Sequence, residues 1–328
     1  MAFDRWTEVA GAADLDDVLL PGTMLQNGRY LVRSFLGSGG FGNAYVARDS
    51  LDRDVVLKEC FVPELCLRSQ GAVVPRAGTP AQNLARVMAS FRQEAQTLSL
   101  LSHPGIVRTH GCFDENGTVY VVLDHIRGRD LQDLIDGDAT LSPARIVAIA
   151  RRLISALGHV HDRGFLHCHI SPDNVCLRDA GEPVRIDFGS ARRWVDGVAQ
   201  PGAGFSMVKD GYSPHEFYIP NAPFRPASDI YALGATLHHA ITGQPPQDGQ
   251  TRRNALADGA PDPYAPLAGR VAGYPARFLA SVDKALSTLA SDRFRSADDW
   301  LAALDGQGAG TGALLPMPWP QQTAVPAG

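Results

Sequence analysis

Apolar and polar residues alternate along the first part of the chain in the manner of β-strands. Several runs are rich in aromatic and β-branched residues and are separated by Gly, Ser and Asp, which is typical of short strands joined by turns. One longer stretch places apolar side chains at steps of three and four, the period of a helix. The sequence therefore predicts strands over residues 30–37, 43–48, 55–59, 106–112 and 118–124, with a helix over residues 82–101.

The second part of the chain has the pattern of amphipathic helices. A capping serine followed by proline, Ser142-Pro143, predicts a helix start, and the helix is expected to end at Gly164. A similar pattern begins near Ser228 and closes at Gly243. Two further helices are expected over residues 276–289 and 297–304. The predicted fold class is α+β, with a β-rich lobe that contains one helix joined to a larger α-rich lobe.

Composition limits the class of protein. The 328 residues are 45% hydrophobic, enough for a full core in one large domain or two lobes. Lys and Arg number 30 against 35 Asp and Glu, without a basic block, so we expect neither nucleic acid nor an anionic membrane as partner. No apolar run approaches the roughly 18 residues of a membrane span, and the acidic N-terminus is unlike a signal peptide. The five cysteines lack paired CxxC spacing, which favours reduced thiols in a cytoplasmic protein.

Changes in composition divide the chain into four parts. Residues 1–27 and 306–328 are expected to be tails, the second dominated by Gly, Ala and Pro with hardly any charge. Both are predicted to be disordered, since such segments bury little apolar surface. Residues 28–124 form the predicted β-rich lobe, and residues 125–305 form the helical lobe.

A glycine-rich motif lies between the first two predicted strands, with Gly37, Gly39 and Gly42 at its key positions. Glycines allow backbone N–H groups to close over phosphate oxygens without a Cβ in the way. A dinucleotide fingerprint requires a helix next, whereas this chain continues as a strand, which excludes that interpretation. A flexible hairpin is the alternative on this motif alone.

Lys58 lies within an otherwise apolar predicted strand, a costly place for a cation unless an anion meets it. Glu94, on the predicted helix, is the natural ion partner. The alternative is that Lys58 extends to solvent at an edge strand while Glu94 is a solvated helix residue.

Further motifs follow in a fixed order, among them Phe-Leu-His-Cys-His-Ile-Ser-Pro-Asp-Asn over residues 165–174. Over about residues 29 to 304, the sequence resembles the protein kinase family, and within it the bacterial serine/threonine kinases. The motifs that carry the resemblance are the glycine motif, Lys58, Glu94, His103-Pro104-Gly105-Ile106-Val107, Asp187-Phe188-Gly189, Tyr212-Ser213-Pro214-His215-Glu216 and Asp229-Ile230-Tyr231-Ala232-Leu233-Gly234. The resemblance implies a two-lobed kinase fold that binds ATP and Mg²⁺ and acts on, or holds, a protein.

The resemblance also implies residue roles. Lys58 would hold the α- and β-phosphates with Glu94 orienting it, and Asn174 and Asp187 would hold magnesium ions. The remaining positions would surround the adenosine: Asp124, His125 and Ile126 at the hinge, Leu123 as gatekeeper, Asp130 near the ribose, Ala44 and Val56 above adenine, and Cys176 below it. Glu216 with Arg293 would brace the helical lobe, and Asp229 would anchor the catalytic loop.

The chain departs from the family in its catalytic loop, where His167-Cys168-His169 replaces His-Arg-Asp. His169 therefore stands at the position of the base aspartate. An imidazole can accept a proton near neutral pH, yet it lacks the negative charge that aims the acceptor hydroxyl at the γ-phosphate. We expect a loss of roughly 10²- to 10⁴-fold in phosphotransfer. Cys168 replaces the arginine that pairs with a phosphorylated activation loop in many members, so control by such phosphorylation is not expected.

Ser171 stands where most family members have the lysine that contacts the γ-phosphate, and Lys209 stands where they have a threonine. The hydroxyl and the amine are thus exchanged between two positions that the family fold places side by side. Lys209 is therefore predicted to take the phosphate-binding role.

Three functional hypotheses follow from these residues. The first is a regulatory pseudokinase that binds Mg-ATP and engages a protein partner. The second is a weak or unusual serine/threonine kinase that uses His169, and the third is a scaffold that binds no nucleotide. A metal-binding cluster is a further alternative for part of the site, with the ligands His167, Cys168, His169, Cys176 and His215.

Overall fold

The computed structural model describes residues 17–39, 42–137, 141–178, 182–185, 192–195, 198–199, 208–219 and 222–306. Its N-terminal part is a six-stranded antiparallel sheet in the order β1-β2-β3-β4-β8-β7. The strands are β1 (Met24–Leu25), β2 (Tyr30–Gly39), β3 (Gly42–Asp49), β4 (Asp54–Cys60), β7 (Thr109–Glu115) and β8 (Thr118–Asp124). The β-rich first lobe predicted from the sequence is confirmed.

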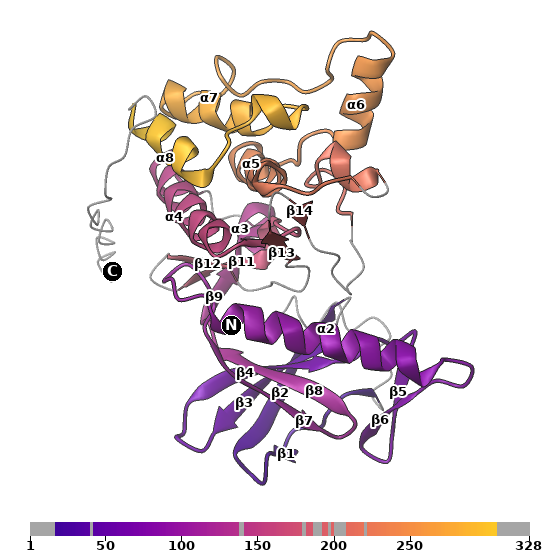
Figure 1. The fold of residues 1–328 in the computed structure, drawn as a ribbon. Coiled ribbons are helices and arrows are strands. Elements are labelled where there is room, and N and C mark those ends of the chain that lie inside the picture. Colours follow the sequence, from indigo (N-terminus) through magenta and orange to yellow (C-terminus); the bar gives the residue numbers. More distant parts are fainter. Residues whose placement is uncertain are drawn as a thin grey trace, which may run out of the picture.

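Helix α2 (Ala81–Ser99) lies across the sheet on the side of the helical lobe (Figure 1). Its buried residues Phe91, Ala95 and Leu98 share a core with residues of β8. The same core includes Ala156 and Val160 from the helical lobe, so apolar packing continues from one lobe to the other. The predicted helix over 82–101 is confirmed to within two residues at each end.

The predicted strand over 106–112 differs from the observed one, because β7 begins only at Thr109. Ile106 and Val107 precede it and are buried in the core that joins the lobes. Their apolar character therefore reflects burial between the lobes. In a single sequence, a short apolar run that is buried in this way cannot be distinguished from a strand.

A hairpin between β4 and α2 was not predicted. It consists of β5 (Cys66–Ser69) and β6 (Ala72–Pro75), and its Val73 N–H donates to the Asn116 carbonyl in the turn between β7 and β8 at 2.7 Å. Because these strands pair only with each other, they form a separate small sheet beside the main one (Figure 1).

Residues 17–27 differ from the expected disordered tail. Val18, Leu19 and Leu25 are buried against the outer face of the main sheet, and β1 adds an edge strand to it. The expectation of disorder up to residue 27 is therefore wrong for residues 17–27. The sequence signal was short, since only a few apolar residues within an acidic stretch form this contact.

The second lobe is mainly helical, as predicted. Its α-helices are α3 (Leu131–Asp136), α4 (Pro143–Asp162), α5 (Pro226–Thr242), α6 (Gly249–Ala257), α7 (Ala276–Ala285) and α8 (Ala297–Asp305). The short 3-10 helices are η2 (Pro172–Asn174), η3 (His215–Tyr218) and η4 (Ala290–Asp292). Helices α4 and α5 contribute much of the buried core, together with α7 and α8, which includes Trp300.

The boundaries of α4 and α5 follow the predicted signals, whereas α7 ends at Ala285, four residues before the predicted end at residue 289. Ser142 caps α4 by accepting a hydrogen bond from the Arg145 N–H at 3.4 Å, and Pro143 is the first helical residue. Helix α5 ends at Gly243, whose φ of +75° is the left-handed conformation that glycine adopts without strain. Helices α3 and α6 were not predicted, since the buried residues are only Leu131 in α3 and Gly249 and Arg252 in α6, which leaves little periodic apolar signal.

Two small three-stranded sheets in the helical lobe carry the loops of the site. One has the order β12-β11-β9, with β9 (Gly128–Asp130), β11 (Val175–Arg178) and β12 (Pro183–Arg185). The other has the order β10-β13-β14, with β10 (Phe165–Leu166), β13 (Arg192–Val195) and β14 (Val198–Ala199). The segment from β10 to β11 contains the motif of residues 167–174.

Candidate active site

The described residues of the glycine motif are the end of β2 and the start of β3, where Gly39 pairs with Gly42. Gly40 and Phe41 lie outside the described residues. A Cβ at Gly42 would lie 1.8 Å from the Glu59 carbonyl oxygen, so this position accepts only glycine without moving the neighbouring strand. The tight approach of β3 to β4 therefore explains the third glycine of the motif.

Lys58 of β4 and Glu94 of α2 form the predicted ion pair. The Lys58 Nζ lies 3.6 Å from the Glu94 Oε1, and both side chains are mostly buried. The Phe91 ring lies 5.8 Å from the same ammonium group. A solvated lysine at an edge strand is excluded, because β4 lies between β3 and β8.

The residues predicted to surround adenine lie near Lys58 in the sheet register. Ala44 pairs with Lys58, and Val56 pairs with Leu123. Along β3 and β4, Ala44, Val56 and Lys58 are half-buried, whereas the residues between them are fully buried on the other face. The half-buried face of these strands is therefore the one that looks toward the helical lobe.

The link between the lobes begins at Asp124, the last residue of β8. Its Oδ1 lies 2.6 Å from the His110 Nε2, and its N–H donates to the Arg108 carbonyl. Ile126 packs partly against the core that joins the lobes. Asp130 caps α3 by accepting a hydrogen bond from the Asp133 N–H at 2.6 Å, and Cys176 pairs with Asp130 between β11 and β9.

Asp229 holds the loop that contains His167 and Cys168. Its two carboxylate oxygens accept hydrogen bonds from the His167 and Cys168 N–H groups, each at 2.8 Å, and from the His161 Nε2 at 3.0 Å. Burial alone raises the pKa of this carboxyl, but these hydrogen bonds and the neighbouring histidines hold the pKa below its ordinary value. Cys168 has a φ of +63°, a left-handed conformation that a non-glycine residue adopts only when its surroundings impose it.

His169 follows in this loop and is half-buried. Its N–H donates to the His167 Nδ1 at 3.3 Å, and its carbonyl accepts a hydrogen bond from the Asn174 Nδ2 at 2.9 Å. The Asn174 amide nitrogen also lies 3.4 Å from the Ser171 Oγ. These contacts use the Asn174 amide nitrogen, and an amide oxygen is the kind of ligand that a hard cation prefers. Asp187, the other predicted metal ligand, lies outside the described residues.

Lys209 reaches the same loop from a distant part of the sequence. Its Nζ lies 3.0 Å from the Ser171 Oγ and 2.6 Å from each carboxylate oxygen of Asp173. The contact between Ser171 and Lys209 agrees with the exchange inferred from the sequence. Burial alone raises the pKa of Asp173, but the Lys209 charge and the hydrogen bonds from Lys209 and Ser171 hold it below its ordinary value. The carboxylate is therefore the ammonium group's principal partner here.

Cys168 lies in an apolar cluster that the sequence did not indicate. Its buried neighbours are Leu166, Phe217 and Phe224, and Trp194 of β13 packs against them. The rings of Phe217 and Phe224 are 4.2 Å apart. An arginine at position 168 would thus meet aromatic side chains in the described part of this cluster.

A buried ion pair braces the helical lobe, as the resemblance implies. The Arg293 guanidinium donates to both carboxylate oxygens of Glu216, at 2.8 and 3.2 Å, and also to the Ala227 and Thr288 carbonyls. The Ser228 hydroxyl donates to Glu216 as well. Such a multiply bonded pair satisfies the groups that burial would otherwise leave unpaired.

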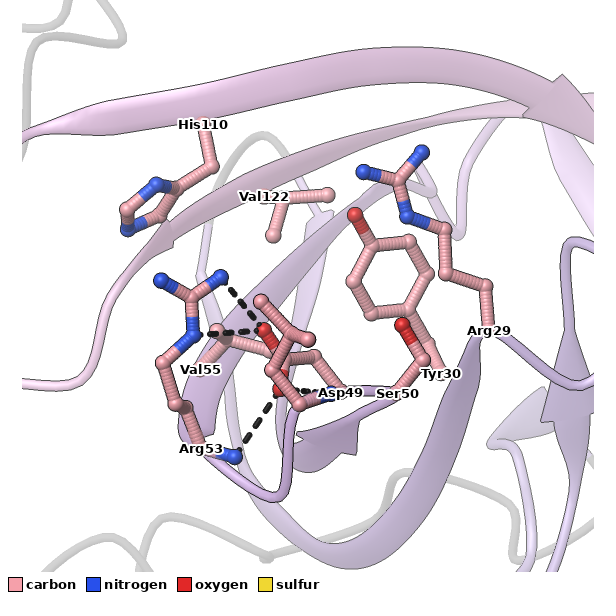
Figure 2. A pocket seen from close by; sticks show the side chains of 9 residues that line it. Arg29, Tyr30, Asp49, Ser50, Arg53, Val55, His110 and Val122 are labelled. Carbon is pink, nitrogen blue, oxygen red and sulfur yellow. Dashed lines mark hydrogen bonds and ion pairs between the residues drawn. The ribbon is translucent and has the colours of Figure 1, made fainter.

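A hollow elsewhere in the first lobe is separate from these residues (Figure 2). It lies on the outer face of the sheet, beside Tyr30, Val55 and Val122, and its Arg53 donates to Asp49 at 2.7 and 2.9 Å. The predicted site residues are not among those that line it. This hollow therefore gives no support to the predicted nucleotide site.

A family model for the protein kinase domain matches residues 30–262. The chain belongs to the protein kinase family. It is 30% identical over 279 residues to the serine/threonine-protein kinase PknD of Mycobacterium tuberculosis (strain ATCC 25618 / H37Rv), covering 84% of this chain and 39% of PknD. It is 31% identical over 295 residues to the serine/threonine-protein kinase PknA of Nostoc sp., covering 85% of this chain and 47% of PknA. The kinase chain thus matches less than half the length of these relatives.

A solved kinase-fold structure is also similar, the apo form of PpkA-294. It superposes with a TM-score of 0.75 at 31% sequence identity, over 88% of this chain and 99% of that one. The two-lobed kinase fold predicted from the sequence is therefore confirmed.

The described part of the kinase chain contains neither a membrane-spanning helix nor a metal-binding group of side chains. None of its helices is both long and apolar enough to cross a membrane. No three His, Cys, Asp or Glu side chains gather there in a way that could hold a metal ion. The proposed metal cluster of histidines and cysteines is therefore not formed by the described residues.

Several residues that shape the kinase site were missed in the sequence. Asp173 was noted only as part of the motif, although it is the main partner of Lys209. Glu59, next to Lys58, is completely buried with Arg68 as its ion partner. A second charge in an apolar strand was the available signal, since neighbouring strand residues face opposite sides. The position of Arg68 could not be foreseen, because it lies in the unpredicted hairpin.

Proposed function

We propose that this kinase domain binds ATP with Mg²⁺, transfers phosphate to serine or threonine weakly or not at all, and acts in signalling as a pseudokinase. The observation that carries the proposal is a catalytic loop with its supports kept and its central side chain changed. Asp229 holds the loop backbone and Asn174 fastens the His169 carbonyl, yet position 169 is a histidine.

The binding half of the proposal rests on the first lobe. Lys58, paired with Glu94, would hold the α- and β-phosphates of ATP, and the glycine turn would cover them. Ala44 and Val56 would lie above the adenine and Cys176 below it, with Asp124 and Ile126 at the hinge and Asp130 near the ribose. The mostly buried Lys58–Glu94 pair supports this assignment, since a partly desolvated ammonium attracts phosphate more strongly than one in water.

Asn174 and Asp187 would hold magnesium in this domain. The Asn174 amide nitrogen donates hydrogen bonds within the loop, and its amide oxygen is the kind of ligand that this ion prefers. When bound, magnesium neutralises charge on the β- and γ-phosphates. Lys209 would add a second positive charge at the γ-phosphate. To do so, its ammonium group would leave the Asp173 carboxylate or contact the carboxylate and the phosphate together.

The transfer half of the proposal rests on His169. Transfer to a hydroxyl requires a group that orients the hydroxyl and accepts its proton. A neutral imidazole offers one lone pair and no negative charge, and an imidazolium has no lone pair to offer and is positively charged. If transfer is lost, the role that remains is the binding of a protein partner in response to ATP.

A second candidate is an active serine/threonine kinase that uses His169 as the base. The intact support of the loop favours it, because Asp229 and Asn174 would hold an imidazole as firmly as a carboxylate. This candidate predicts a transfer rate that falls as the pH drops below the pKa of a histidine, near 6 to 7.

The two candidates and a nucleotide-free scaffold are separated by two measurements on the same protein. ATP and ADP are titrated with magnesium, manganese or calcium while thermal stability is followed, since a ligand that binds the folded state raises it. Transfer of labelled phosphate to a generic basic protein is then measured. Binding without transfer supports the pseudokinase, and transfer at ordinary kinase rates that His169→Ala abolishes supports the active kinase.

The controls for this experiment follow from the site. Lys58→Ala and Asp187→Ala should abolish the thermal shift, whereas Lys284→Ala, on α7 in the helical lobe, should not. No shift in the parent protein at millimolar nucleotide with any of the three metals would overturn the proposal and favour the scaffold.

A further inference from the structure

Glu59 forms a buried polar network on the face of β4 opposite to Lys58. The side chain has no exposed surface, and both of its oxygens lie 2.7 Å from the Arg68 Nη2. The Tyr45 and Tyr120 hydroxyls donate to it at 2.8 and 2.7 Å. Burial, and then the Glu59 charge, raises the pKa of both tyrosines far above the ordinary value, so both remain donors.

The network continues to the strand ends that flank the glycine turn, through Asn43, the residue after Gly42. Its Nδ2 lies 3.4 Å from the Glu59 Oε2, and its Oδ1 accepts a hydrogen bond from the Ser38 hydroxyl at 2.7 Å. Ser38 and Asn43 are also paired in the register of β2 and β3. Side chains thus join the two strands of the turn to each other and to the buried carboxylate.

The network also continues outward to Asp17, in the segment before β1. The Asp17 carboxylate accepts a hydrogen bond from the Arg68 N–H at 2.7 Å. Its carbonyl lies 3.3 Å from the Arg68 Nε and 3.4 Å from the Asn43 Nδ2. Asp17 therefore contacts the inserted hairpin and the end of the glycine turn at once.

We propose that Asn43 is a positioning residue that fixes the glycine turn for phosphate binding, and that Asp17 and the Cys66–Pro75 hairpin control it from outside the nucleotide site. The network lies on the face of the sheet opposite to Lys58, so these residues act through the turn and not by touching the nucleotide. A turn held in one conformation loses less freedom on binding phosphates. This inference rests on the proposed binding of ATP, whose phosphates the turn would cover.

The test compares nucleotides that do and do not reach the turn. Asn43→Ala should weaken ATP and ADP by at least about fivefold, while adenosine, which lacks phosphates, changes less than about twofold. Asp17→Ala should act in the same direction with a smaller effect, about two- to threefold, because it removes only the outer contact. A purely structural role would lower thermal stability and weaken all three ligands alike.

One control variant and one substitute variant complete the experiment. Glu115→Ala removes a different link of the N-terminal segment, in which Glu115 accepts a hydrogen bond from the Gln26 N–H at 2.7 Å, and should leave all affinities unchanged. Asn43→Ser keeps a small polar side chain and serves if the alanine variant fails to fold. Equal affinities of parent and Asn43 variants for ATP would overturn the inference.

A second readout needs no nucleotide. Hydrogen exchange of a peptide covering residues 36–46 should be faster in Asn43→Ala and Asp17→Ala than in the parent, and unchanged in Glu115→Ala. If the parent binds no nucleotide, the proposed function fails, but this exchange still decides whether Asn43 holds the turn. Unchanged exchange in the Asn43 variant would reject the positioning role.

Discussion

The Lys209 ammonium group lies 3.0 Å from the Ser171 hydroxyl, across 38 positions of sequence, and 2.6 Å from both oxygens of Asp173. Most family members are expected to have the amine at position 171 and the hydroxyl at position 209. Here the two groups are exchanged, and they meet beside the catalytic loop. The pairing with Asp173 means that the lysine charge is balanced before any phosphate arrives.

Lys209→Met should weaken ATP binding about tenfold more than ADP binding, because only ATP has the γ-phosphate that this ammonium would contact. Asp173→Asn should shift the ratio the other way, since it removes the carboxylate that competes for the lysine. Isothermal titration with both nucleotides measures the ratio, with Lys284→Met as the control. Equal losses for ATP and ADP would show that Lys209 points elsewhere in the complex.

His169→Asp should raise phosphotransfer at least about tenfold, which corresponds to an interaction of about 1.4 kcal/mol in the transition state. The backbone at this position is already held by Asn174 and by the Asp229-bound loop, so the proposed loss of transfer would come from one side chain. Labelled phosphate incorporated into a generic basic protein, or into the chain itself, measures the gain. If ATP binds and the variant gains nothing, the acceptor surface is at fault and the domain is a binding module.

Cys168→Arg should not restore transfer and should lower the free energy of unfolding by about 3 kcal/mol, because it brings a charge into apolar surroundings. Leu166, Phe217 and Phe224 surround the present thiol. Cys168→Ala, which adds no charge, should cost less than about 1.5 kcal/mol. Urea unfolding of the three proteins gives these values, and an arginine variant as stable as the parent would contradict the prediction.

Stability should fall as the pH drops from 7 toward 5, with His103 as one cause. Burial, and then the charges of His159 and Arg163, lowers the pKa of His103 to about 4, against about 6.5 in the unfolded chain. The neutral form is favoured in the folded state, so its contribution is complete above pH 6.5 and is lost as the pH falls toward 4.

Thermal melts of the parent and His103→Gln across this pH range test that contribution. The variant should lose less stability on acidification, by at most about 1.4 kcal/mol for each pH unit, the limit for one proton. The Gly105 N–H donates to the His103 Nδ1 at 3.0 Å, so the variant is also expected to be less stable at pH 7. Parallel pH profiles of the two proteins would exclude His103 as a cause.

Much of the fold could be predicted from short-range patterns. The helix of residues 143–162 follows from a serine cap, a proline at the first turn and an apolar face, and the strands β2, β3, β4 and β8 follow from their composition. The paired charges Lys58 and Glu94 could also be predicted, since a lysine in a buried strand requires an anion.

Other features depend on contacts between distant residues. The β5–β6 hairpin has too few residues for a periodic signal, and it is stabilised by Arg68 against Glu59 and Asp17. Val18 and Leu19 pack on the sheet although the acidic segment around them resembles a tail. In both cases the free energy comes from tertiary burial, which local propensity does not report.

The residue types alone indicate which chemical groups this kinase domain carries: the Lys58 amine, the glycines of the motif, the Asn174 amide and the His169 imidazole. The contacts that hold those groups follow from the tertiary fold. It joined Lys209 to Asp173, placed Cys168 among aromatic rings, and linked Asn43 through Glu59 to Arg68 and Asp17. The reason is physical, since a residue type fixes charge and hydrogen-bonding capacity, whereas the partner of a buried group depends on which distant segments fold against it.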